Sequence, residues 1–211
     1  TSNVRFGVNA GNSIASGGNF NTVVGDEAGT AINTGDKNVF VGYAAGDATT
    51  SSVNNVAIGT EALTTNILGS SSVAIGTGAL AVQNPASAVS MLNVAVGQDA
   101  GVNVTTGVEN TLIGGLAGDA LTSSNNNVAV GKSALSGNTV SSSNVAIGTR
   151  ALEIFNVTSD TSTYNVAVGE DAGALLTTGV QNTIVGGLAG DAVTTGSYNV
   201  IMGTNAGGGV T

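Results

Sequence analysis

The chain has 211 residues, including 33 glycines and no cysteine, and only 8% of its residues are charged and 3% aromatic. Its net charge of −9, from 13 acidic and 4 basic residues, argues against binding to a nucleic-acid backbone or an anionic membrane. Both kinds of binding need clustered Lys and Arg. Without Cys there is no disulfide framework or thiolate metal site, and no apolar run reaches the roughly 18 residues of a membrane span.

One repeated unit runs through the chain: Asn, three mostly apolar residues, Gly, two variable residues, Ala, then Gly or Leu. Internal repeats at a fixed period are the signature of solenoids and related arrays. Asn opens every unit except the fifth, which has Ser72. The glycines of the twelve units are Gly7, Gly25, Gly42, Gly59, Gly76, Gly97, Gly114, Gly131, Gly148, Gly169, Gly186 and Gly203.

Most of these glycines are 17 residues apart, with a first gap of 18 and two gaps of 21. A longer rhythm of 72 residues lies on top, because Gly25, Gly97 and Gly169 are equally spaced and the Gly-or-Leu position repeats every four units. We therefore predict one repeat domain over residues 1–211, built on a four-unit module. The missing initial Met and signal peptide indicate part of a longer or processed protein.

The tripeptides after Asn are rich in β-branched residues, which favours strands. In chain order the expected strands are 4–6, 22–24, 39–41, 56–58, 73–75, 94–96, 111–113, 128–130, 145–147, 166–168, 183–185 and 200–202. A 17-residue period is too short for paired helices and suits one coil of a parallel β-solenoid. The prediction is an all-β protein with a single parallel solenoid, a β-roll or β-helix, of about twelve coils. Stacked at ~4.8 Å, these make a rod roughly 55–60 Å long.

Side chains alternate between the two faces of a strand. The first and third positions of the tripeptide are almost all apolar, so we assign them to the inside of the coil. The middle position then points outward and forms an apolar stripe that another copy of the chain would cover. The predicted oligomer interface comprises Ala57, Ala74, Ala95, Leu112, Ala129, Ala146, Ala167, Ile184 and Ile201.

The segments Asn55–Ala62 and Asn144–Ala151 share the pattern Asn-Val-Ala-Ile-Gly-Thr-x-Ala. This pattern resembles the head repeats of trimeric autotransporter adhesins, which are parallel β-rolls packed three side by side. The pattern of Asn21–Gly29 and Asn182–Gly190 is similar to repeats of phage tail fibres. The resemblance implies a parallel trimer in an extracellular fibre, on a cell surface or a virion, that attaches to a cell-surface glycan or protein receptor. It leaves the choice between adhesin and tail fibre open.

Two sets of polar residues follow the repeat. The Asn residues at the start of each unit are interpreted as a structural ladder, in which each amide bonds to the next coil or caps a turn. The acidic residues Glu27, Asp99 and Asp171 share one position, and Asp47, Asp119 and Asp191 share another. Carboxylates beside glycine turns can bind Ca²⁺, which is kept as an alternative to solvated surface charge.

The sequence has no His and no Cys, so the usual acid–base and thiol catalysts are missing. Adjacent acids such as Asp26-Glu27 and Glu170-Asp171 would point to opposite faces of a strand, which does not suit a glycosidase pair. We therefore predict no catalytic residues and no cofactor, with a glycan-cleaving tailspike as a remote alternative. An ice-binding solenoid is another, although the Thr pairs at 49–50, 64–65 and 105–106 differ in register.

The two 21-residue units carry extra residues within Val82–Leu92 and Phe155–Tyr164. Insertions in solenoids form loops on one face, often the binding face. Pro85, Met91, Phe155 and Tyr164 are the candidate receptor-loop residues, and plain structural decoration is the equal alternative. No nucleic-acid partner and no membrane insertion of this segment are expected.

Overall fold

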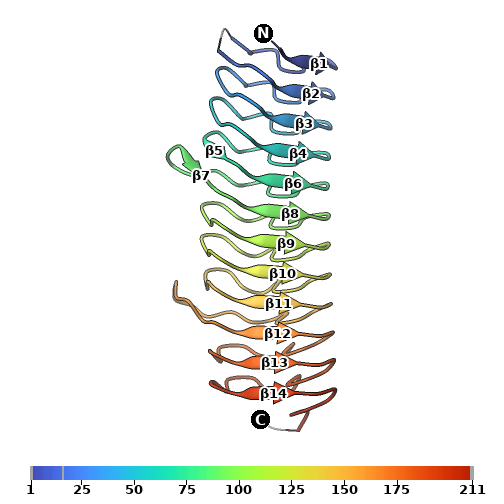
Figure 1. Cartoon of the computed structure of the whole chain (residues 1–211), viewed down its shortest axis with the longest axis vertical. Helices are drawn as coiled ribbons and strands as arrows, with labels where there is room; N and C mark the ends of the chain where they lie inside the picture. Colours follow the sequence, from blue (N-terminus) through green and yellow to red (C-terminus); the bar gives the residue numbers. More distant parts are fainter. Residues whose placement is uncertain (1, 16, 210–211) are drawn as a thin grey trace.

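The structure is a computed structural model that describes residues 2–15 and 17–209 (Figure 1). Twelve three-residue strands stack along the rod as one parallel sheet, in the order β1-β2-β3-β4-β6-β8-β9-β10-β11-β12-β13-β14. They are β1 Val4–Phe6, β2 Thr22–Val24, β3 Val39–Val41, β4 Val56–Ile58, β6 Val73–Ile75, β8 Val94–Val96, β9 Thr111–Ile113, β10 Val128–Val130, β11 Val145–Ile147, β12 Val166–Val168, β13 Thr183–Val185 and β14 Val200–Met202. The predicted all-β solenoid of about twelve coils is confirmed, and the described residues contain no helix.

A second, two-stranded parallel sheet pairs β5 Gly69–Ser70 with β7 Val89–Ser90. It lies beside the main stack, where the first long coil leaves the rod (Figure 1). The second long coil bulges on the same side, and there Ser142 and Ser162 form an isolated parallel bridge. The extra residues of both 21-residue units are therefore accommodated sideways and do not interrupt the twelve-stranded sheet.

Equivalent residues of successive coils lie directly above one another. Ala129 of β10 pairs with Leu112 of β9 on one side and with Ala146 of β11 on the other. The backbone bonds continue past the strands, for example from Gly131 N–H to the Ile113 carbonyl at 2.7 Å. The backbone donors and acceptors of one coil are thus satisfied by its neighbours, which a buried β layer requires.

The coils turn through residues in the left-handed region, several of which are not glycine. Lys37 (φ 59°), Ala44 (φ 51°) and Leu63 (φ 57°) represent three such corner positions. The glycine after each strand is needed for a second reason. A Cβ at Gly131 (φ 134°) would lie 2.5 Å from the carbonyl oxygen of Gly148 in the next coil. No side chain fits there, which explains why this glycine is present in all twelve units.

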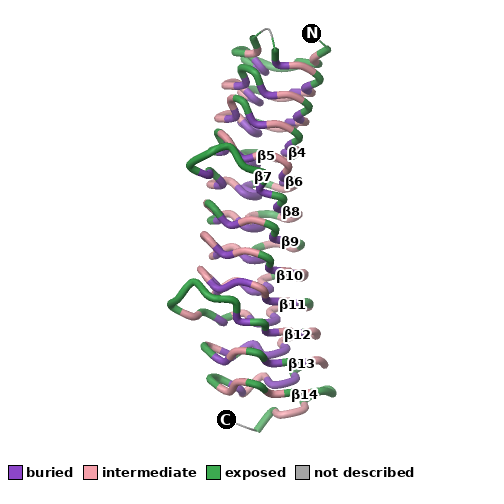
Figure 2. Tube along the Cα trace, turned by 60° about the vertical axis from the view of Figure 1, so that its left-hand side comes forward, coloured by how far each residue is buried: buried purple, intermediate pink, exposed green. Residues whose placement is uncertain are grey.

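The interior of the coil corrects the assignment of the strand faces. The middle residues of the tripeptides point inward, and from Val23 to Ile184 they are completely buried. They form one buried cluster with the Ala that lies three residues after the glycine, from Ala10 to Ala189. Buried stretches of backbone recur in successive coils along the rod (Figure 2). The first and third positions, which we expected inside, lie on the outer face and are half-buried or exposed.

The four-coil rhythm follows from the limited volume inside the coil. Where the middle residue is large, as in Phe40, the residue after the fixed Ala is Gly46, and a Cβ there would come within 2.6 Å of the Phe40 ring. Where the middle residue is Ala57, the same position is Leu63, which is fully buried. In the coils of Ala95 and Ala167 both positions are small, and a Cβ at Gly101 would instead meet Leu112 and Leu80 of the neighbouring coils. Large side chains from the same coil or from its neighbours thus fill the space, as close packing demands.

Candidate functional site

The residues predicted as the oligomer interface do not lie on the surface. Ala57, Ala74, Ala95, Leu112, Ala129, Ala146, Ala167 and Ile184 have an exposure of 0%, and Ile201 is partly buried against the same core. The prediction was wrong because both faces of the strand are apolar, so alternation alone could not decide which one points inward. One signal within the sequence bears on it: Leu follows the fixed Ala only where the middle residue is Ala, and every large middle residue goes with Gly there.

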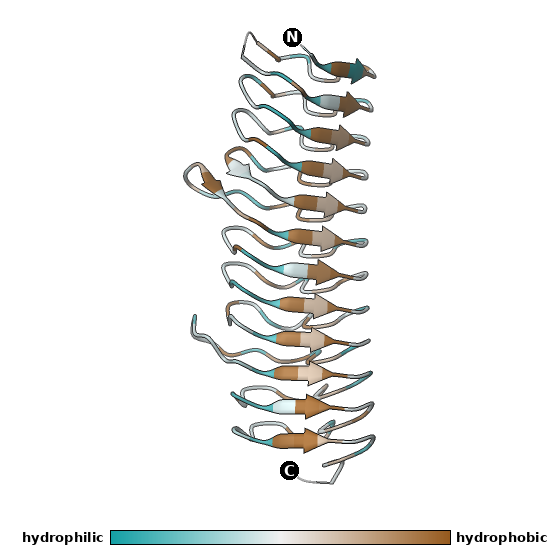
Figure 3. Ribbon diagram, viewed as in Figure 1, coloured by the Kyte–Doolittle hydropathy of each residue, from teal (hydrophilic) through white to brown (hydrophobic). Residues whose placement is uncertain are grey.

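The outer face of the twelve-stranded sheet is formed by two apolar columns instead. We call it the outer sheet face and define it by the first and third residues of each strand. The first column is Val4, Thr22, Val39, Val56, Val73, Val94, Thr111, Val128, Val145, Val166, Thr183 and Val200; the second is Phe6, Val24, Val41, Ile58, Ile75, Val96, Ile113, Val130, Ile147, Val168, Val185 and Met202. Figure 3 shows that most strands are hydrophobic along the rod, with a hydrophilic stretch in β1 and paler positions in some others. Ile58, Ile113 and Ile147 each expose nearly two-fifths of their surface.

The Asn ladder is structural, as predicted. From Asn21 to Asn182 the side chains of the ladder Asn residues are buried, and Asn127 shows how such an Asn bonds in three directions. The Oδ1 atom of Asn127 accepts the backbone N–H of Asn144 at 3.0 Å, its own N–H donates to Asn110 Oδ1 at 3.0 Å, and its Nδ2 donates to the Ser141 carbonyl at 3.1 Å. The amides are therefore occupied within the rod and do not form a binding surface.

Three of the four candidate receptor-loop residues are also buried. Phe155 and Met91 have an exposure of 0%, and Pro85 is buried as well. Phe155 occupies the core position that Leu121 and Leu176 fill in other coils, while Met91 packs beside Gly69, where a Cβ would lie 2.9 Å from its Cγ. Their bulk anchors the long coils to the rod, which is why they cannot contact a receptor.

The exposed parts of the long coils are other residues. Tyr164, the remaining candidate, is 57% exposed at a corner next to β12. The segments 86–90 and 158–162 are exposed throughout, and both long coils extend sideways from the rod on one side (Figures 1 and 2). The first segment is small and weakly apolar, and the second is rich in hydroxyl groups with one acid, Asp160.

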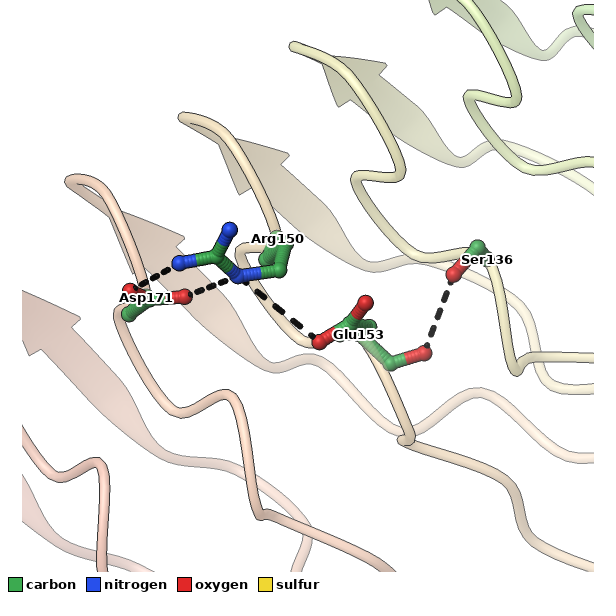
Figure 4. A network of polar contacts seen from close by, with 4 residues as sticks. All are labelled: Ser136, Arg150, Glu153 and Asp171. Atoms are coloured by element: carbon green, nitrogen blue, oxygen red, sulfur yellow. Dashed lines mark hydrogen bonds and ion pairs between the residues drawn. The ribbon is translucent and has the colours of Figure 1, made fainter.

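The acidic residues of the first set lie along an outer corner. Asp171 forms a two-pronged ion pair with Arg150 of the preceding coil, at 2.7 Å to Nε and 2.5 Å to the second nitrogen (Figure 4). The hydrogen bonds that Arg150 donates to Asp171 are the main cause that raises the pKa of the Arg150 guanidinium. Glu27 accepts a 2.9 Å bond from Asn9, and its neighbour Asp26 accepts the Val8 N–H at 3.0 Å. These acids are held by local partners.

The acids of the second set differ from one another. Asp47 Oδ1 accepts the hydroxyl of Thr64 at 2.7 Å, whereas one carboxylate oxygen of Asp119 and one of Asp191 are buried without a partner. Burial is the largest cause that raises the pKa of Asp119, opposed by bonds from the backbone of Asp119 and Ala120. Among the described residues, no three His, Cys, Asp or Glu side chains lie close enough together to hold a metal ion.

Threonines also form a column on another side of the rod. The hydroxyls of Thr105 and Thr122 donate to the carbonyls of Thr122 and Thr139 in the next coil, at 3.2 and 3.0 Å. Thr49 and Thr64, in contrast, lie at other positions of the coil and bond to Asn66 and Asp47. The hydroxyl groups of these threonines are thus directed at the rod itself.

A shallow hollow of about 290 Å³ lies on the surface and is lined by Gln98, Gly115, Leu116 and Lys132. No helix in the part of the chain that the structure describes is long and apolar enough to cross a membrane.

No protein-family model, curated protein or solved structure matches this chain.

Proposed function

We propose that the chain is a non-catalytic structural segment of an extracellular fibre, in a surface adhesin or a phage tail fibre, that contributes to attachment to a cell surface. In this role the rod is a rigid spacer, and the exposed segments 86–90 and 158–162 are the surface that meets a glycan or protein receptor.

The continuous axial hydrogen bonding of the rod is the observation that carries this proposal. All twelve strands pair one to one along the axis, and the buried Asn ladder runs beside them. Bending such a rod between two coils requires backbone bonds and ladder bonds to break together. A spacer that keeps its length under load needs this property.

The position of the long coils supports the attachment part of the proposal. Both leave the rod on the same side without disturbing the stacking of the strands. Loops held by a rigid scaffold are common binding elements. Their spacing along the rod is fixed by the sheet, so two contacts to one receptor surface would reinforce each other.

The test is to pass the purified chain over a glycan array and over intact cells and to measure both retention and released reducing sugar. We expect retention without release. A matched control deletes residues 158–161, which shortens the long coil to the 17 residues of its neighbours; it should keep the β-sheet circular dichroism spectrum and lose retention. Release of sugar would assign the chain to the glycan-cleaving alternative, and thermal hysteresis in freezing solutions would assign it to ice binding. Either result contradicts the proposal.

A further inference from the structure

Two of the three tyrosines lie on one corner of the rod, in its C-terminal coils. Tyr164 stands two residues before β12, and Tyr198 stands two residues before β14 (Figure 1). Between them, Gln181 has the equivalent place before β13. The φ angles of these three residues lie between 53° and 61°, so the backbone turns in the same way at each level. The corner therefore carries an aromatic, a polar and an aromatic side chain on three successive coils.

The three residues are exposed, while the backbone that carries them is held by the rod. Tyr164 is 57% exposed and Tyr198 is 74% exposed. The N–H of Gln181 donates to the Thr163 carbonyl at 2.8 Å, and the N–H of Tyr198 donates to the Val180 carbonyl at 3.0 Å. The two tyrosines are thus two coils apart along the axis, or ~9.6 Å. The stacking of the coils fixes this spacing.

Polar groups without charge adjoin the two tyrosines. The amide of Gln181 is exposed between them, and one coil before Tyr164 the same corner position is Ser143. The Ser143 hydroxyl donates to the Ser162 hydroxyl at 3.3 Å, so the exposed segment 158–162 ends against this corner. The corner thus combines accessible aromatic rings with neutral hydrogen-bonding groups, which are the two kinds of contact that a sugar makes with a protein.

We propose that this corner binds a neutral, extended glycan of β-linked pyranoses that runs along the rod. We call it the tyrosine ledge and define it by Ser143, Tyr164, Gln181 and Tyr198. The inference rests on the proposed function, because it names the ligand class of the same attachment surface.

The spacing of the coils matches the length of a sugar. A tyrosine offers a flat apolar face to the C–H groups of a pyranose, and amides and hydroxyls bond to its hydroxyl groups. One ring of an extended β-linked glycan advances by about 5 Å, close to the ~4.8 Å between coils. Each coil then meets one sugar: Tyr164 and Tyr198 stack on the first and the third, and Gln181 bonds to the second.

Two features favour a neutral glycan over other extended ligands. The net charge of −9 repels sulfated or sialylated chains, and Asp160 lies in the exposed segment that ends at the ledge. Proline-rich peptides repeat at a similar distance, about 9 Å for three residues, but they dock in aromatic-lined grooves. Tyrosines as exposed as Tyr164 and Tyr198 protrude from a corner and do not line a groove.

Calorimetric titration of the purified chain with cellohexaose and with chitohexaose tests the ledge in solution. We expect at least one of them to bind, and Tyr164→Ala and Tyr198→Ala should each weaken its binding about tenfold, as the loss of one central contact does. Tyr164→Phe keeps the ring and should stay close to the wild type. The matched control is Tyr43→Ala, which removes an equally exposed tyrosine from another corner and should leave the affinity unchanged.

The spacing of two coils is tested by moving one ring. Gln181→Tyr combined with Tyr198→Gln keeps the composition but places the two rings on adjacent coils, ~4.8 Å apart. Rings this close pack against each other and offer a single platform, so the double variant should bind as weakly as Tyr198→Ala. Maltohexaose, whose α-linked chain curls, should bind more weakly than the preferred β-linked probe. The circular dichroism spectrum of each variant checks that the rod is folded.

The proposal is wrong if neither β-linked probe binds, if the Tyr-to-Ala variants bind like the wild type, or if the double variant or maltohexaose shows full affinity. Tyrosine-dependent binding of decaproline in place of the sugars would assign the ledge to a proline-rich peptide. Retention by cells without binding of these sugars would contradict the ledge alone. Binding of the sugars without retention by cells would contradict the proposed attachment alone.

Discussion

The Oε1 atom of Gln83 accepts a hydrogen bond from Nδ2 of Asn93 at 2.9 Å, at the one level where the Asn ladder has a serine. The same oxygen accepts the hydroxyl of Ser72 at 3.2 Å. In other coils this acceptor is the Oδ1 atom of the ladder Asn, as between Asn93 and Asn110. Gln83 therefore reaches across the coil and supplies the amide oxygen that Ser72 lacks.

We predict that Gln83→Leu destabilises the rod by about 1–3 kcal/mol, because it leaves buried polar groups of Ser72 and Asn93 without their acceptor. Leucine itself fits this core position, since Leu121 and Leu176 occupy it in other coils. The double variant with Ser72→Asn restores a ladder oxygen in its usual place and should recover most of the loss. Urea unfolding of the two single variants and the double variant measures the coupling.

The coupling is the decisive quantity. Additive effects of the two substitutions would mean that Gln83 and the ladder position are independent. In that case the hypothesis that Gln83 supplies the oxygen missing at Ser72 is wrong, even if each single variant is destabilised.

Much of the fold follows directly from the sequence, because each coil repeats the same chemical requirements. Two residues reappear at the same spacing: a glycine with no room for a Cβ, and a buried Asn with bonds in three directions. The strands, the register and the Asn ladder were therefore predictable. The direction of the strand faces did not follow from the alternation of side chains alone. It depends on which of the two apolar faces fits beside the fixed Ala inside the coil. The volume available there is set by contacts between positions six residues apart, such as Phe40 with Gly46.

The burial of Phe155 and Met91 was hidden for a different reason. Both stand in insertions, and insertions are normally exposed, so the sequence makes them candidate receptor-loop residues or structural decoration. Their true function is to fill the coil where the longer chain returns to the rod. The hydrogen bonding of Gln83 could not be predicted either. The sequence at this variable position does not indicate that the glutamine lies beside Ser72.

The size matching inside the coil predicts a compensating pair. Gly46→Leu alone should be destabilising by about 1–3 kcal/mol, since its side chain collides with the Phe40 ring. Phe40→Ala alone should cost about 3–5 kcal/mol through the cavity that it leaves. The double variant recreates the combination of Ala57 with Leu63, whose φ of 57° is close to the 58° of Gly46, and should recover much of the combined loss. Thermal unfolding followed by circular dichroism measures the three midpoints.

The control combines Phe40→Ala with Gly118→Leu, which lies in a coil further along the rod and collides with Leu112 instead. This pair should show no recovery. Equal recovery in both pairs would contradict size matching within a coil.

The corrected faces predict opposite outcomes for neighbouring residues. Ala129→Lys places a charge in the closed interior, where Ala129 has an exposure of 0%, and should prevent the rod from folding. Val130→Lys places the same charge on the outer sheet face and should leave the circular dichroism spectrum of the folded rod unchanged. A folded Ala129→Lys variant together with an unfolded Val130→Lys variant would reverse the assignment of the faces.

Burial of Asp119 predicts that replacing it by Asn stabilises the rod by an amount that depends on pH. Its equivalent Asp47 accepts the hydroxyl of Thr64, but one coil after Asp119 the residue is Ser136, whose hydroxyl donates to the Glu153 carbonyl at 3.3 Å instead (Figure 4). The buried oxygen of Asp119 is left without a partner, and burial raises the pKa of this carboxyl above its ordinary value of 3.8. The folded rod therefore holds the proton more tightly than the unfolded chain. The stability that this contributes is complete below pH 3.8 and is lost as the pH rises through the raised pKa.

Asp119→Asn removes this loss, because the amide stays neutral. The variant should match the wild type under acidic conditions and unfold at a higher temperature than the wild type near pH 7. A pH series of melting temperatures measures the difference. Asp47→Asn is the control: its carboxylate has the Thr64 hydroxyl as a partner, which an ionised acceptor binds more strongly than an amide, so no gain is expected. A difference between wild type and Asp119→Asn that is the same at every pH would show that charge burial at Asp119 is not its cause.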